Sequence, residues 1–65
     1  MNPKKAKILL RENKVYPIKV IHFSSKQVTL QESEKVFVTV LVEDVEFDYS
    51  GMDKNAIEEF RNKFL

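Results

Sequence analysis

Apolar and polar residues alternate along most of this 65-residue chain with the two-residue period of β-strands, and near the end they change to the period of a helix. β-branched and aromatic residues are frequent in the alternating part, as is typical of strands. Strands are expected over 7–11, 15–23, 27–31, 36–42 and, more briefly, 45–49. Turns are expected in the short polar stretches 12–14, 24–26 and 32–35.

Two positions interrupt this strand pattern. Pro17 has no N–H group to donate, so its end of the second strand is expected at a sheet edge or a bulge. At Glu43 and Asp44 the apolar phase moves by one residue, which predicts a bulge or a sharp bend. Between them, the segment 36–42 is apolar on both faces, and this predicts a central strand covered from both sides.

The last part of the chain has one apolar stripe with the spacing of a helix. Ser50 or Asp53 would cap the start of this helix, which is expected over 53–64. The stripe consists of Ala56, Ile57, Phe60 and Phe64, and is extended at its two ends by Met52 and Leu65.

This order predicts an α+β, mostly β fold, an antiparallel four- to five-stranded meander with one C-terminal helix. Two closures remain open. An SH3-like small barrel is slightly favoured, and an open sheet with the helix on one face is the alternative. One domain spans residues 1–65, divided into a basic N-terminal arm (1–6), a sheet or barrel (7–49) and the helix (53–64).

The composition excludes several chemistries. Without Cys there is no disulfide or thiolate metal site, and one Gly does not make a phosphate-binding loop. The single histidine, His22, lies in a largely apolar strand and is interpreted as structural or simply exposed. We therefore expect a protein that is not an enzyme and has no cofactor or metal. A core this small is marginal, so a homodimer would add stability.

The chain also has no long apolar segment. The N-terminus begins basic, but the run Ile8–Leu10 is shorter than the apolar part of a signal peptide. The segment 36–42 is far too short to cross a bilayer. No membrane association is expected, and the cytoplasm is the expected location.

The formal net charge is only +1, but the charges are strongly segregated. Lys and Arg dominate residues 1–26, whereas Asp and Glu dominate residues 27–53. Segregation of this kind indicates a binding surface. The acidic row, defined here as Glu43, Asp44, Glu46 and Asp48, together with apolar groups near it, is the candidate site for a protein partner.

The basic half supports an alternative function. Small β-barrels bind nucleic acid with a positive groove and stacking aromatic rings. The candidate residues for nucleic acid are Lys4, Lys5, Lys7, Lys14, Tyr16 and Lys19. A third alternative is a purely structural subunit of a homo-oligomer.

One segment is similar to a known family. Residues 45–55 read VEFDYSGMDKN, which resembles a strand followed by a Tyr-Thr-Gly-Leu-type turn in small phage- and prophage-encoded proteins of the YopX type. Ala56 departs from that pattern, which has Gly at this place. The resemblance implies a phage or mobile-element origin and carries over no catalytic or binding residue.

Overall fold

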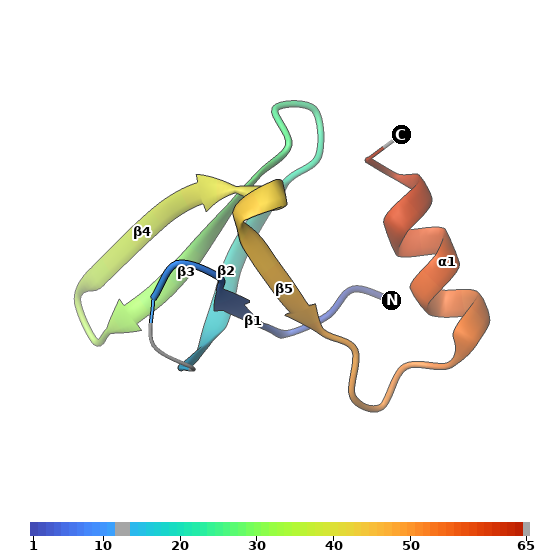
Figure 1. Ribbon diagram of the computed structural model, residues 1–65, viewed down its shortest axis with the longest axis horizontal. Helices are drawn as coiled ribbons and strands as arrows, with labels where there is room; N and C mark the ends of the chain where they lie inside the picture. Colours follow the sequence, from blue (N-terminus) through green and yellow to red (C-terminus); the bar gives the residue numbers. More distant parts are fainter. Residues whose placement is uncertain (12–13, 65) are drawn as a thin grey trace.

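The computed structural model describes residues 1–11 and 14–64, which form a five-stranded antiparallel sheet followed by one helix (Figure 1). This confirms the α+β, mostly β fold with a C-terminal helix. The expected turn at 12–14 and the contribution of Leu65 lie partly or wholly outside the described residues. The elements are β1 (Lys5–Ile8), β2 (Val15–His22), β3 (Gln27–Ser33), β4 (Val36–Leu41), the 3₁₀ helix η1 (Val42–Asp44), β5 (Val45–Asp48) and α1 (Lys54–Asn62).

The sheet is open, with the strand order β4-β3-β2-β1-β5. Its two edges are β4 and β5, although these strands are neighbours in the chain. The described residues adopt the open sheet, so the slightly favoured SH3-like barrel was wrong: β4 pairs with β3 and β5 pairs with β1, and these two edge strands do not pair with each other. Helix α1 lies beyond β5, on the side of the molecule opposite β4 (Figure 1).

Strand β2 connects the two halves of the sheet. Its first residues pair with β1, and those from Ile18 onwards pair with β3, with an irregular register between Ile18 and Val20. The N–H group of Ile18 donates to the carbonyl of Lys4 (2.8 Å). Because successive N–H groups of a strand point in opposite directions, the missing N–H of Pro17 falls on the side away from β1. Pro17 therefore lies just before the first β2–β3 pair and next to the irregular register at Ile18–Val20, close to the edge or bulge that was predicted.

Strand β1 begins and ends earlier than expected. It includes Lys5 and Ala6 of the supposed arm, and Leu9 and Leu10 lie beyond its end. The backbone N–H of Leu9 donates to the backbone carbonyl of Asp44 (3.0 Å), and the chain then turns away from the sheet. Leu10 is consequently 88% exposed rather than part of a strand.

Strand β4 corrects the prediction of a central strand. Within the described part of the chain it pairs with β3 on one side only, and its other side is a free edge. Val38 and Val40 pack against the core, whereas Val36, Phe37 and Leu41 are 49, 46 and 44% exposed. Strand β4 is therefore apolar on both faces although only one face packs against the core.

The bend predicted at Glu43 and Asp44 is confirmed as η1. After this turn the apolar residues continue in the shifted phase, so that Val45 and Phe47 of β5 are buried. Gly51, with φ +80°, then allows the tight turn in which the N–H of Met52 donates to Tyr49 (3.0 Å).

Helix α1 is attached to the sheet through aromatic rings. Asp53 caps it by accepting a hydrogen bond from the N–H of Ala56 (2.8 Å). Phe60 is 1% exposed, and its ring centroid lies 4.9 Å from that of Phe47 and 6.0 Å from that of Phe23. The core joins Val28 and Leu30 of β3 to this aromatic cluster, which comprises Phe23, Phe47, Tyr49, Phe60 and Phe64.

Candidate protein-binding surface

The basic and acidic parts of the sequence meet in the pairing of β1 with β5. Lys5 lies opposite Asp48, and Lys7 lies opposite Glu46. The Nζ atom of Lys7 is 3.9 Å from a carboxylate oxygen of Glu46. Side chains opposite each other in an antiparallel pair share a face, so these four residues form a mixed stripe in which opposite charges offset one another.

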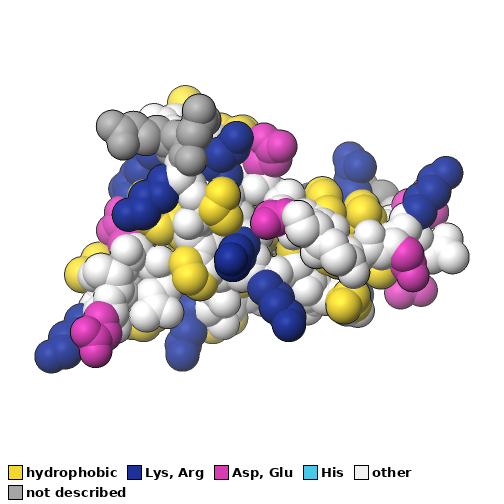
Figure 2. Space-filling model, turned by 90° about the horizontal axis from the view of Figure 1, so that it is seen from below, with side chains coloured by type: hydrophobic (Ala, Val, Ile, Leu, Met, Phe, Trp, Pro, Cys, Tyr) yellow, Lys and Arg dark blue, Asp and Glu magenta, His cyan; other side chains and the backbone are white. Residues whose placement is uncertain are grey.

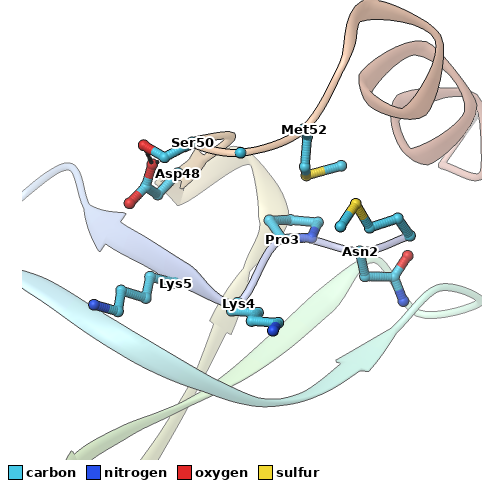
Figure 3. A pocket seen from close by; sticks show the side chains of 9 residues that line it. Asn2, Pro3, Lys4, Lys5, Asp48, Ser50 and Met52 are labelled. Carbon is cyan, nitrogen blue, oxygen red and sulfur yellow. Dashed lines mark hydrogen bonds between the residues drawn. The ribbon is translucent and has the colours of Figure 1, made fainter.

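Asp48 is also held by the turn that follows it. Its Oδ1 atom accepts hydrogen bonds from the hydroxyl (2.6 Å) and the backbone N–H (3.0 Å) of Ser50 (Figure 3). These two bonds and the nearby charge of Lys5 stabilise the ionised form, so the pKa of Asp48 is lower than its usual value. Asp48 therefore has a structural role in the turn.

A shallow hollow lies beside this turn, between the N-terminal segment and the connection from β5 to α1. Met52 lies over Pro3, and Asp48 and Ser50 form one wall (Figure 3). The hollow has a volume of about 340 Å³ and is lined by Met1, Asn2, Pro3, Lys4, Lys5, Asp48, Ser50, Gly51 and Met52.

The four members of the acidic row differ in their exposure to solvent. Glu43 and Glu46 are exposed, whereas Asp44 and Asp48 are half-buried. The carbonyl of Asp44 accepts the N–H of Leu9, which ties η1 to the end of β1. Glu43 and Glu46 are thus the members of the row best placed to meet a partner.

An apolar groove runs between β5 and α1, and Glu46 contributes to its lining. We call it the β5–α1 groove. Its volume is about 390 Å³, and Arg61 of α1 stands on its helical side. The lining consists of Val42, Val45, Glu46, Phe47, Tyr49, Phe60, Arg61 and Phe64.

The sequence identified a binding residue only on the β5 side of this groove, where Glu46 belongs to the acidic row. The helical stripe that contains Phe60 and Phe64 was interpreted as core, which is correct for Phe60, whereas Phe64 is half-buried. Arg61 carried no signal of its own. The four-residue spacing of Phe60 and Phe64 predicted that these two rings share a helix face, but no pattern placed Arg61 with them.

The candidate residues for nucleic acid are spread over different parts of the sheet. Tyr16 is only 7% exposed, so little of its ring is accessible to a stacking base. The ammonium of Lys14 lies 5.4 Å from the centre of that ring. Lys19 instead lies 6.0 Å from the ring of Phe37, across the β2–β3–β4 half of the sheet. Lys4 is exposed on the N-terminal segment, while Lys5 and Lys7 face Asp48 and Glu46.

Polar side chains cross the outer face of that half of the sheet. The Nε2 atom of His22 is 3.0 Å from the hydroxyl oxygen of Thr29, which in turn lies 2.8 Å from that of Thr39. His22 is half-buried in this line of hydrogen bonds. Its contacts are those of a residue that joins three strands.

Within residues 1–11 and 14–64, no group of three or more His, Cys, Asp or Glu side chains is arranged to hold a metal ion. The same residues contain no helix with the length and apolar character needed to span a bilayer. No protein-family model, curated protein or solved structure matches the chain. The resemblance of residues 45–55 to YopX-type proteins stays a prediction.

Proposed function

We propose that this chain is a small, non-enzymatic interaction module that binds and modulates a protein partner through the β5–α1 groove. The proposal rests on one observation, the presence of Glu46 on the β5 side of a groove whose other lining residues are apolar except for Arg61 on the helical side. An apolar partner segment that carries Lys or Arg matches this lining. Its apolar side chains would cover the half-buried Tyr49 and Phe64, and its cation would meet Glu46.

The position of the groove also suits a short peptide segment. One wall is β5, an edge strand, and the other is α1, which packs on the sheet through its aromatic residues. Short segments bind edge strands and apolar grooves by main-chain hydrogen bonds and by side chains placed in pockets. Residues 45–55, on which the YopX-type resemblance rests, form β5, the connection to α1 and the first two residues of α1. A phage or mobile-element origin is part of the proposal.

A displayed library of random peptides tests the proposal. Selection on the purified protein should enrich peptides that combine apolar residues with Lys or Arg. Glu46→Lys should weaken binding of such a peptide about tenfold, because it replaces an attraction at the groove by a repulsion. The matched control is Glu58→Lys, the same charge change at an exposed position of α1 that does not line the groove.

Equal loss of binding in both variants would mean that net charge, and not the groove, controls affinity. Selected peptides without basic residues would contradict the role of Glu46. The nucleic-acid alternative has less support in the fold, since Tyr16 is buried and two of its lysines face carboxylates. It remains an outcome that direct titration with DNA and RNA can establish.

A further inference from the structure

Strand β4 is an unprotected sheet edge. It contains no charged residue and no proline, and four of its six residues are exposed. Edge strands normally carry lysines, prolines or bulges that prevent pairing with another chain. The register irregularity between β3 and β4 lies near the start of β4, at Ser33 and Val36, and leaves the rest of the edge regular.

The pairing with β3 shows which backbone groups face the free edge. The N–H of Val42 donates to the carbonyl of Lys26 (2.9 Å), which continues the β3–β4 register by one pair. Hydrogen-bonded and non-hydrogen-bonded pairs alternate along an antiparallel ladder. The N–H and C=O groups of Phe37, Thr39 and Leu41 therefore point away from β3, towards the open side.

We propose that a second copy of this chain occupies this edge, with the two β4 strands antiparallel about a two-fold axis at Thr39. In this register Phe37 of each copy lies opposite Leu41 of the other on the outer face. Val38 lies opposite Val40 on the core face, so the two cores continue into each other. The backbone groups that face the free edge then pair with their own counterparts, as an isologous interface requires.

The charges that flank β4 fit this register. Lys35 precedes the strand and Glu43 follows its end, and both are exposed. Antiparallel pairing about Thr39 brings Lys35 of one copy to the end where Glu43 of the other lies, and the contact occurs twice. Strand β4 thus has no internal charge but has opposite charges at its two ends. This arrangement is complementary to a second, antiparallel copy of the same strand.

The size of the domain favours the same partner. A 65-residue chain without disulfides buries a small core, and pairing would cover Val36, Phe37 and Leu41. The β5–α1 groove lies at the other edge of the sheet, so the dimer does not depend on the proposed function.

Sedimentation velocity over a range of protein concentrations tests the dimer. The wild type should pass from monomer to dimer and form nothing larger. Lys35→Glu should weaken the dimer about tenfold, because two attractive pairs become repulsive. The double variant Lys35→Glu/Glu43→Lys should restore it. A monomer at every concentration, or an affinity unaffected by Lys35→Glu, would overturn the proposal, as would open-ended oligomers, which indicate a β4-to-β5 contact instead.

Single cysteines test the register, since the chain has none of its own. Thr39→Cys should form a disulfide between copies under mild oxidation, because a residue on the two-fold axis faces itself at a bridgeable distance. Val38→Cys is the control and should cross-link much more slowly. Preferential cross-linking of Val38→Cys would refute the register about Thr39. Thr39→Lys should abolish the dimer while leaving peptide binding at the groove unchanged, so the two proposals can fail separately.

Discussion

At the scale of single residues, Asp48 connects β5 to the turn before α1 and faces Lys5 across the ladder. Its lowered pKa means that the folded state favours the ionised carboxylate. Asp48 therefore contributes stability that is fully present above the pKa of the unfolded chain, about 3.9, and is lost as the pH falls through the lower folded value.

We expect Asp48→Asn to reduce the stability of the fold at pH 7, and to reduce it less at acidic pH. The difference in unfolding free energy between wild type and variant should shrink as the pH falls below the unfolded pKa and through the lower folded pKa, because wild-type Asp48 then becomes neutral. Urea unfolding at several pH values measures this difference. Ser50→Ala, which removes the strongest hydrogen bond to Asp48, should reduce the same pH dependence in part. A difference that is constant with pH would contradict the role of the charge.

Gly51 presents a second residue-scale test. Its φ of +80° disfavours side chains, although a Cβ there would meet no atom within 4 Å. Gly51→Ala should therefore destabilise the fold by about 1–2 kcal/mol through the backbone alone. Gly51→Asn should cost less, since Asn tolerates this conformation better. Thermal unfolding of both variants gives the comparison, and equal costs would contradict a purely backbone origin.

At the scale of elements, the sequence predicted which segments form strands but not which strands are neighbours. The phase change at Glu43 and the proline at position 17 were local signals, and both were confirmed. The position of β4 at the edge of the sheet had no local signal in the sequence. An apolar residue such as Phe37 has the same pattern in a central strand and at a free edge, and only the pairing of β5 with β1 makes β4 the edge.

The candidate site was likewise only partly predictable. The sequence showed the acidic row, but the residues that its members contact depend on strand register. Lys7 meets Glu46 because β5 pairs with β1. The far wall of the groove comes from α1, whose direction of approach depends on the aromatic packing of Phe60.

Helix α1 provides the test at this scale. Phe60 is its only buried residue among those described. Phe60→Ala should cost about 3–5 kcal/mol, a large share of the stability of a domain this small. Leu10→Ala, which trims an exposed residue, should change stability by less than about 0.5 kcal/mol. Urea unfolding measures both, and a cost for Phe60→Ala near that of Leu10→Ala would mean that α1 is not anchored through this ring.

At the scale of the whole molecule, folding mixes the charges that the sequence separates. Pairing of β1 with β5 sets two lysines against two carboxylates, and Arg11 forms an ion pair with Glu32 of β3. In the view from below, basic and acidic side chains are interspersed over the surface (Figure 2). Affinity for nucleic acid depends on neutralising successive phosphates with a continuous positive surface.

We therefore predict weak binding to nucleic acid despite the lysine-rich first half of the chain. In fluorescence anisotropy at about 50 mM salt, labelled single- and double-stranded DNA and RNA should show no saturable binding below about 100 µM protein. Glu46→Lys is an informative comparison, because it removes one of the carboxylates that offset Lys7 and should strengthen any residual binding. Saturable binding by the wild type that falls steeply between about 50 and 200 mM salt would contradict the prediction. It would show that Lys4, Lys14 and Lys19, which lie outside the β1–β5 stripe, suffice to hold a phosphate backbone.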